Sequence, residues 1–318
     1  MQTYLKTRPA WIQLLMFIGM AFGIFFILSV FGMMILSSLT GIGMSELKNI
    51  ENWDYNNPNM IYFMRGMLLM QFLGLFVIPS LLYSYFADPA PREYLGLKKP
   101  WLPVYWILGI MILVVAIPFV EYLGVLNQKI NLDADTQKWM KGMEEDAAKQ
   151  IQFMLRKHTI SELVLNLIFI AVFAGVGEEL FFRGILQRIF IRAFKSPWAG
   201  IIITAAIFSG FHFQFFGFFP RFALGILLGA LYWYSGSLWT AILAHFIYDG
   251  LIIVLVYLNP EMIKNPETPM VNPAYLILVA TISLAATLYI LWQMKRNSAT
   301  SYAEIYKDDQ PPSNQITF

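Results

Sequence analysis

The chain has 318 residues, of which 58% are hydrophobic and only 13% are charged. Soluble domains carry roughly a quarter of charged residues, so this composition excludes an ordinary soluble protein and indicates lipid as the main solvent. The formal net charge of +2 is not gathered into long basic runs, which excludes nucleic acid as a partner. The chain has no cysteine, and this excludes disulfides, thiolate metal sites and a cysteine nucleophile.

Apolar stretches long enough to cross a bilayer recur along the whole sequence. A hydrocarbon core of about 30 Å requires about 20 apolar residues in a helix. The first stretch is too long for a signal peptide and has no cleavage site, so we interpret it as a retained helix. We predict an all-α membrane bundle of about eight transmembrane helices with an intramembrane polar cavity. The predicted spans are 11–39, 60–86, 104–125, 161–190, 199–218, 221–236, 238–257 and 274–293.

This pattern divides the chain into three parts. Residues 1–159 hold the first three predicted helices and a polar loop, and residues 160–257 hold helices four to seven. Residues 258–318 hold the last helix and a tail whose polar sequence predicts disorder. We therefore expect the central part, which contains the polar side chains described below, to be the functional core.

The loop before the fourth helix has its own periodic pattern. Apolar residues recur every four positions, with acidic residues and lysine between them, which predicts an amphipathic helix. Such a helix can lie on the bilayer surface, pack on the bundle or cover a cavity as a lid, and the sequence leaves these alternatives open. The apolar positions are Trp139, Met143, Ala147, Ile151 and Leu155.

Lysines and arginines near the helix ends predict the orientation, because cytoplasmic loops are enriched in them. If eight helices alternate, four basic clusters fall on one side, which places both termini in the cytoplasm. The loop before the fourth helix is also basic and lies on the opposite side, so it argues against this orientation. The four clusters comprise Lys6, Arg8, Arg92, Lys98, Lys99, Arg188, Arg192, Lys195, Lys295 and Arg296.

Ionisable side chains lie inside three of the predicted spans. Each costs several kcal/mol in a bilayer, so such groups normally face a cavity and have a function. At 1.5 Å per residue they lie roughly 10 to 20 Å from the cytoplasmic ends of their helices, so we expect them to meet. The motifs supply Glu178, Glu179 and Arg183 in GVGEELFFRG, Phe208 and His212 in FSGFHF, and His245 and Asp249 in AHFIYDG.

The two adjacent glutamates are expected to have different functions. Neighbouring residues on a helix point about 100 degrees apart, so the two carboxylates cannot share one partner equally. Glu179 is four residues before Arg183, the spacing of a helical ion pair, and this pairing orients Glu179. Glu178 is not part of this ion pair and is free to face the cavity, where we predict that it acts as a general base on water.

The histidines and Asp249 complete the predicted site. His212 can help to polarise the same water. His245 and Asp249 are four residues apart on one helical face and can donate hydrogen bonds to a developing oxyanion, or Asp249 can orient His245. His212, His245 and Glu178 also match the ligand types of catalytic zinc, although no HExxH motif is present. Metal-bound and metal-free mechanisms therefore both stay open, with zinc as the only expected cofactor.

Taken in order, the three motifs resemble the signature of the CAAX-protease and bacteriocin-processing (CPBP) family, which includes the Ras-converting CAAX endopeptidase and the Abi proteins. That signature is EExxxR, then FxxxH, then HxxxN or HxxxD, and the resemblance covers roughly 160–257. It implies hydrolysis of a peptide bond by a water that the first glutamate, Glu178, and a histidine activate. In this pattern Arg183 and Phe208 have orienting roles, and Asp249 stands where many members have asparagine.

The family implies an intramembrane endopeptidase whose partners are a peptide or protein substrate, lipidated or membrane-associated, and the lipid bilayer. Its expected location is the bacterial inner membrane. Two alternatives use the same residues differently. One is a non-proteolytic membrane scaffold or bacteriocin-immunity factor that binds a partner through the cavity. The other is a proton-coupled transporter, although the repeated halves typical of transporters are not visible.

Overall fold

The computed structural model describes residues 4–43, 53–130, 132–264 and 272–305, and within these ranges every regular element is a helix. Among the residues that the structure describes, seven helices or helix runs are long and apolar enough to cross a membrane, which confirms the predicted all-α membrane fold. The elements are α1 (Ala10–Thr40), α2 (Met60–Gln71), η2 (Phe72–Val77), α3 (Ile78–Ala87), α4 (Pro91–Tyr94), α5 (Val104–Gln128), α6 (Ala134–Leu155), α7 (Ile160–Asn166), η3 (Leu167–Val172), η4 (Ala174–Gln187), α8 (Arg188–Phe194), α9 (Pro197–Gly210), η5 (Phe215–Gly217), α10 (Phe218–Ser235), α11 (Leu238–Leu258), α12 (Glu261–Lys264), α13 (Pro273–Arg296) and α14 (Tyr302–Ile305).

The fifth predicted span, at 199–218, is wrong at its C-terminal end. It corresponds to α9, which has 14 residues and is therefore only about 21 Å long. The helix begins where the Ser196 side chain caps it, and it ends at Gly210 because the chain then turns, with a left-handed φ of 53° at Phe213. The phenylalanine-rich sequence stays apolar through this turn, so hydropathy alone could not reveal it.

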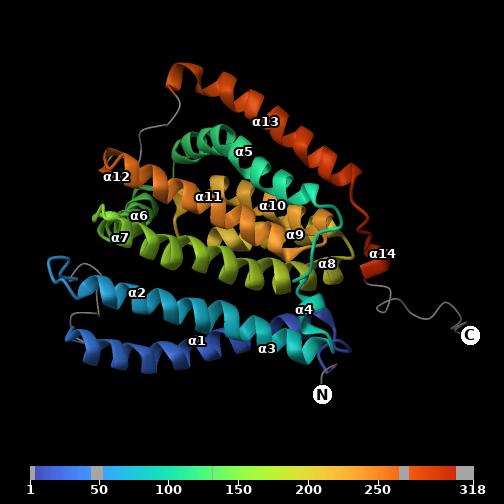
Figure 1. Ribbon diagram of the computed structural model, residues 1–318, viewed down its shortest axis with the longest axis horizontal. Coiled ribbons are helices and arrows are strands. Elements are labelled where there is room, and N and C mark those ends of the chain that lie inside the picture. The colour runs from blue at the N-terminus through green and yellow to red at the C-terminus, as the bar shows by residue number, and fades with distance from the viewer. Residues whose placement is uncertain (1–3, 44–52, 131, 265–271, 306–318) are drawn as a thin grey trace, which may run out of the picture.

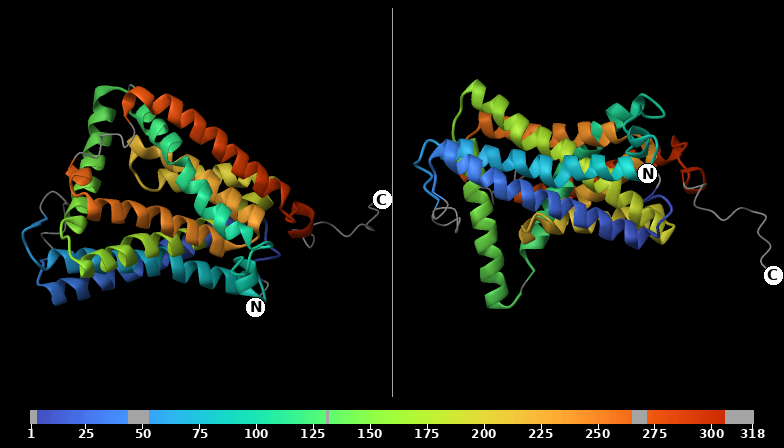
Figure 2. Two further views of the ribbon diagram at one scale, coloured as in Figure 1. Left: turned by 45° about the horizontal axis from the view of Figure 1, so that its top comes forward. Right: turned by 90° about the horizontal axis from the view of Figure 1, so that it is seen from below.

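The helices form three stacked layers, which Figures 1 and 2 show from three directions. The first layer contains α1 and the continuous run from α2 to α3. The middle layer contains the run from η3 to α8 together with α9, α10 and α11. The outer layer contains α5 and α13, which pack against each other, and α5 also packs on α10 and α11. Any side chain that must be shielded from lipid is therefore best placed on the middle layer.

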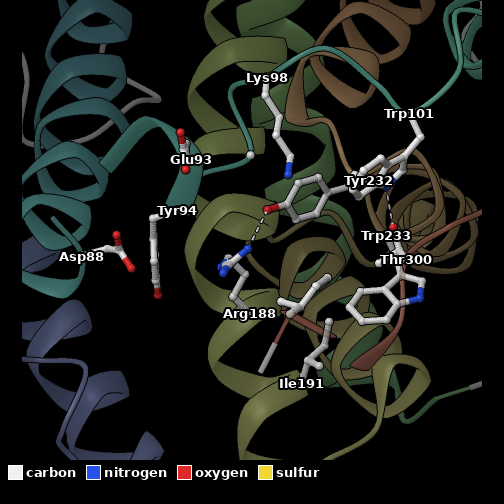
Figure 3. Close-up of a pocket in the computed structure, with 13 residues that line it drawn as sticks. Asp88, Glu93, Tyr94, Lys98, Trp101, Arg188, Ile191, Tyr232, Trp233 and Thr300 are labelled. Atoms are coloured by element: carbon white, nitrogen blue, oxygen red, sulfur yellow. Dashed lines mark hydrogen bonds between the residues drawn. The ribbon is translucent and has the colours of Figure 1, made fainter. Parts of the chain in front are cut away.

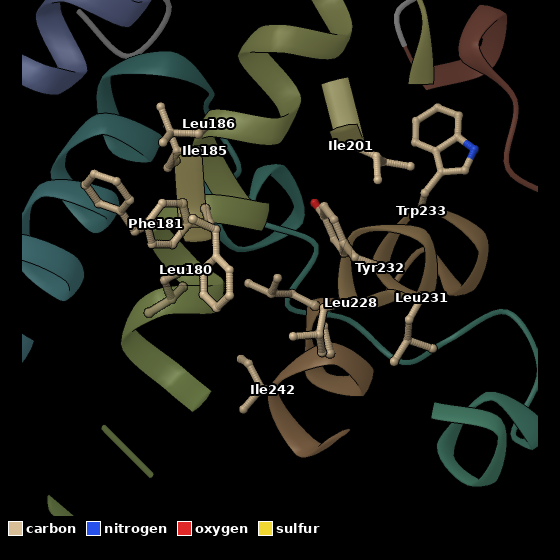
Figure 4. Close-up of a cluster of buried hydrophobic side chains, with 14 of the residues drawn as sticks. Leu180, Phe181, Ile185, Leu186, Ile201, Leu228, Leu231, Tyr232, Trp233 and Ile242 are labelled. Carbon is tan, nitrogen blue, oxygen red and sulfur yellow. The ribbon is translucent and has the colours of Figure 1, made fainter. Parts of the chain in front are cut away.

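The core of the bundle lies where the middle layer meets its neighbours. Figure 4 shows Phe181 and Ile185 of η4, Leu228 of α10 and Ile242 of α11 in this cluster. The cluster extends from α1 to α13, so residues 1–159, 160–257 and 258–318, the three parts defined in the sequence analysis, share one hydrophobic core. By contrast, α1 exposes most of its apolar side chains, as expected for a helix that faces lipid.

The amphipathic helix predicted in the loop before the fourth span is present as α6. The Asp133 carboxylate caps its first turn by accepting from the backbone N–H of Thr136, and this bond lowers the pKa of Asp133. In Figures 1 and 2 the helix lies across one end of the bundle, at the end opposite to α4, α8 and α14.

The C-terminal tail is described only in part. Residues Tyr302–Ile305 form the single helical turn α14, so this part of the segment predicted to be disordered is helical. The remaining residues, 306–318, lie outside the described ranges.

Candidate active site

Glu179 and Arg183 form a sealed ion pair in the middle layer. Both side chains have 0% exposure, and Arg183 Nη1 donates to Glu179 Oε1 at 2.8 Å, as the four-residue spacing predicted. The guanidinium also donates to the main-chain oxygen of Gly225 at 3.1 Å and lies 4.5 Å from the centroid of the Phe208 ring. Arg183 therefore joins η4 to α10 and to α9, and the ion pair holds three elements of the site together.

His245 of α11 is oriented by this ion pair. Its Nδ1 lies 2.8 Å from Glu179 Oε1, and because a carboxylate of an ion pair accepts hydrogen bonds, this ring nitrogen is the donor. The other nitrogen, Nε2, lies 3.4 Å from Asp249 Oδ2 and 4.0 Å from Glu178 Oε2. One imidazole thus connects the sealed carboxylate of Glu179 with the two carboxylates that border the cavity.

Exposure increases in steps from Glu179 toward the cavity. The side-chain exposure is 0% for Glu179, 9% for His245, 14% for Glu178 and 26% for Asp249. Among the described residues, Glu178 Oε2 has no hydrogen-bond partner although it is buried. A carboxylate oxygen with this placement can accept a hydrogen bond from water or from a ligand in the cavity.

His212 approaches the site from the turn after α9, and it is not on the helix that the sequence predicted. Its Nδ1 lies 2.8 Å from the main-chain oxygen of Phe208. A carbonyl oxygen can only accept, so Nδ1 carries a proton and Nε2 of the neutral ring is an acceptor. The Phe208 ring packs edge-on against both His212, at 5.0 Å between centroids, and His245, at 6.1 Å. Phe208 thus separates and positions the two histidines.

A cavity of about 720 Å³ contains the polar ends of these residues. Glu178, His212, His245 and Asp249 line it together with mostly apolar side chains from α2, η2, η3 and α10. α6 borders it as well. Its lining residues from α6 are Ala147, Gln150, Ile151 and Met154. The cavity is large enough for a peptide segment and has one cluster of ionisable groups on an apolar wall.

A close approach of two helices holds these groups together. A Cβ added to Gly175 would lie 3.1 Å from the backbone nitrogen of Phe246 and 3.2 Å from the backbone oxygen of Ile242. Only glycine allows α11 to approach η4 so closely. Since His245 and Asp249 are on α11 and the glutamates are on η4, this contact sets the distance between the two halves of the site.

Residues 160–251 match a protein-family model described as type II CAAX prenyl endopeptidase Rce1-like. The motif residues Glu178, Glu179, Arg183, Phe208, His212, His245 and Asp249 are inside this segment, whereas α2, η2 and α6, which also border the cavity, precede it. The expected resemblance to the CAAX-protease family is confirmed. This Rce1-like segment is similar to CAAX-type prenyl endopeptidases, and the apolar spans among the described residues indicate an integral multi-pass membrane protein.

Two bacterial proteins are also similar to this chain. An uncharacterized 24.3 kDa protein of Escherichia coli is 27% identical over 195 residues, which cover 60% of this chain and 78% of that protein. The uncharacterized protein YpbD of Bacillus subtilis (strain 168) is 30% identical over 89 residues, which cover 27% of this chain and 42% of YpbD. No solved structure matches the chain significantly.

The residues expected to hold zinc, His212, His245 and Glu178, all line the large cavity. In the part of the chain that the structure describes, no group of three or more histidine, aspartate or glutamate side chains is arranged to hold an ion. The prediction of a metalloprotease is therefore not supported, and no step below is assigned to a metal.

Sequence reasoning missed Arg221, which also lines the cavity of the Rce1-like segment. The signal was present, because Arg221 is a charged residue in the first turn of a predicted span, and such residues normally serve a function. Sequence reasoning also could not reveal that α6 borders the cavity, since amphipathicity shows that a helix has an apolar face but not what that face contacts.

A second cavity of about 430 Å³ lies at the other end of the molecule (Figure 3). Arg188 borders it, with its guanidinium carbon 4.5 Å from the ring centroid of Tyr94 and Nη1 3.4 Å from the Tyr232 hydroxyl. The two cavities have no lining residue in common. The cluster of glutamates and histidines is thus confined to the larger one.

Proposed function

We propose that this protein is an intramembrane endopeptidase that hydrolyses a peptide bond of a membrane-associated or lipidated peptide or protein. The observation that carries the proposal is the Glu178 carboxylate, which borders the large cavity with an oxygen that accepts no hydrogen bond from the described residues. His212, His245 and Asp249 border the same cavity. Glu178 and His212 can both accept hydrogen bonds from a water, and His245 can donate one to the oxyanion. Peptide hydrolysis requires groups of these kinds.

In the proposed reaction, Glu178 accepts a proton from a water that His212 Nε2 also holds. The resulting hydroxide attacks the peptide carbonyl carbon, and the carbonyl electrons move to its oxygen to form a tetrahedral oxyanion. His245 donates a hydrogen bond from Nε2 to this oxyanion. Since Nδ1 already faces Glu179, this role requires His245 to carry protons on both nitrogens, a form that the neighbouring Asp249 carboxylate stabilises.

The tetrahedral intermediate then collapses. The carbon–nitrogen bond breaks as Glu178 transfers its proton to the leaving amine, which gives one product with a new amine and one with a new carboxylic acid, which then loses its proton to solvent. Glu179 and Arg183 take no part in the proton transfers. Their sealed ion pair holds His245 in position, because Glu179 Oε1 accepts from both Arg183 and His245.

The first test is a cleavage assay in liposomes on hydrophobic peptides with the wild type and the Glu178→Gln variant. A general base contributes about 10²- to 10⁴-fold, so we expect the variant to lose at least a hundredfold in kcat. The matched control is Glu145→Gln on the exposed side of α6, which should keep full activity. Equal turnover by the wild type and Glu178→Gln would eliminate the protease and favour a non-proteolytic scaffold.

The natural substrate can be found by comparing membrane protein termini in cells that carry the wild type or Glu178→Gln. New termini that depend on Glu178 identify both the protein cleaved and the bond broken. Whether these termini come from lipidated proteins decides between the two substrate classes in the proposal.

A further inference from the structure

Arg221 is fixed in the wall of the large cavity by a residue next to the site. Its Nη1 donates to the main-chain oxygen of Gln214 at 3.0 Å, and Nη2 donates to the side-chain oxygen of the same residue. A Cβ added to Gly217 would lie only 2.5 Å from Nη1, so the guanidinium lies directly against this glycine. Because Gln214 is two residues after His212, the position of the guanidinium is tied to that of the histidine.

The positive charge of Arg221 contributes little to the stability of the fold. A cation in the first turn of the 18-residue helix α10 opposes the helix dipole, and the surrounding wall is mostly apolar. Arg183 has a carboxylate at 2.8 Å, whereas among the described residues none lies within ion-pair distance of Arg221. Glu144, Glu178 and Asp249 act on it only from further away. An anionic ligand in the cavity would supply the missing partner.

The geometry also limits which anion fits. A guanidinium presents five N–H donors in a planar fork, and those not used by Gln214 can bind a carboxylate through two parallel hydrogen bonds. The rest of the cavity wall, with Met67, Leu68 and Phe72, suits apolar side chains. The ligand that matches both features is an apolar peptide that carries one carboxylate.

We propose that Arg221 binds a carboxylate of the substrate peptide and thereby determines which peptide bond lies at Glu178. This inference rests on the proposed function and specifies its substrate class. The carboxylate can be the C-terminal one of the peptide or that of an acidic side chain near the cleaved bond.

Glu144 of α6 is the carboxylate whose charge acts most strongly on Arg221, from beyond ion-pair distance. Burial raises the pKa of Glu144, and the positive charge of Arg221 counteracts this effect. A substrate carboxylate that reaches Arg221 competes with Glu144 for the guanidinium. Binding of such a substrate would therefore weaken the electrostatic attraction between α6 and α10 at the border of the cavity.

The test measures peptide binding to the Glu178→Gln protein in phosphatidylcholine nanodiscs, where no anionic lipid competes. Three apolar decapeptides with one neutral dye are compared by fluorescence anisotropy: the free acid, the C-terminal amide, and an amide that ends in glutamate. Hydrogen bonds between two charged groups are stronger than those between neutral groups, so we expect at least one carboxylate peptide to bind about tenfold or more tightly than the plain amide.

Variants in the same background assign the preference to Arg221. Arg221→Gln should reduce the affinity ratio to about one, and Arg221→Lys should keep part of it, because lysine retains the charge but not the fork. Gly217→Ala should also lower the ratio, since it displaces the guanidinium while keeping the arginine. Glu144→Gln should strengthen binding of the carboxylate peptides. The matched control, Arg188→Gln, removes an arginine from the other cavity and should leave the ratio unchanged.

Equal affinity for all three peptides, or a preference that persists in Arg221→Gln, would overturn the inference. A preference of the free acid alone assigns the carboxylate to the peptide C-terminus, and a preference of the glutamate peptide assigns it to a side chain. Cleavage by the wild-type protein is measured separately. A binding preference for carboxylate peptides without cleavage would count against the protease and support the role of Arg221. Cleavage without such a preference would support the protease and count against the role of Arg221.

Discussion

Glu178 and Glu179 are neighbours in sequence, yet the fold places them in different surroundings. Glu179 is sealed and accepts from Arg183 and His245, and Glu178 borders the cavity. The sequence predicted this division from the four-residue spacing between Glu179 and Arg183. It could not predict that the partner of Glu179 on α11 is His245, because periodicity describes one helix and not the distance between two.

Glu178→Gln and Glu179→Gln should therefore differ in stability. Removing one member of a buried ion pair leaves an unpaired charge and costs about 3–5 kcal/mol, so Glu179→Gln should unfold at a clearly lower temperature. Glu178→Gln breaks no hydrogen bond to the Oε2 atom among the described residues and should unfold close to the wild type. Both variants should lose activity. Unfolding can be followed in detergent by the fluorescence of the nine tryptophans.

The double variant Glu179→Gln, Arg183→Gln is the control for this prediction. If the single variant is unstable because Arg183 is left unpaired, removing that charge should restore part of the unfolding temperature. A double variant that is less stable than Glu179→Gln by the full effect of Arg183→Gln would show that the two side chains act independently.

The elements show a similar limit of sequence reasoning. Long apolar runs such as α1 and α11 were predicted within a few residues, because their length and uniform hydropathy determine them. The fourth span was predicted as a plain α-helix, but η3 and η4 within it have the wider π-helical hydrogen bonding that is frequent at functional sites. Such a widening depends on packing against neighbouring helices and leaves no distinct pattern in hydropathy.

Gly175→Ala tests whether the contact between η4 and α11 sets the geometry of the site. The added methyl group meets backbone atoms of α11, which cannot rotate away, so we expect a loss of about 1–3 kcal/mol in stability. The shift of α11 moves His245 relative to Glu178. A displacement of about 1 Å can cost about a hundredfold in rate, which cleavage assays on folded protein would detect.

Gly23→Ala is the matched control, since it lies in the membrane helix α1 and its added Cβ meets nothing within 4 Å. It should keep both the stability and the activity of the wild type. Full activity in Gly175→Ala would show that the site tolerates a change in the spacing of η4 and α11.

On the scale of the whole molecule, the position of α6 decides from which side the large cavity is reached. The cavity is bordered by α6, at the end of the bundle opposite to α4, α8 and α14 (Figure 1). The basic residues Arg92, Lys98, Arg188 and Arg192 belong to the segments at the end with α4 and α8. If the enrichment of basic residues in cytoplasmic loops holds here, α6 and the border of the cavity face the non-cytoplasmic side.

We expect both termini to be cytoplasmic, which reporter fusions in bacterial inner membranes can test. Green fluorescent protein fused after Phe318 should fluoresce, and alkaline phosphatase fused after Lys129 should be active, because the first reporter folds in the cytoplasm and the second outside it. The lysines of α6 argue for the reverse orientation, since they also lie close to membrane helices. A dark fluorescent fusion together with an active phosphatase after Phe318 would show that the reverse holds. The large cavity would then open toward the cytoplasm, and the search for substrates would turn to proteins that reach the membrane from that side.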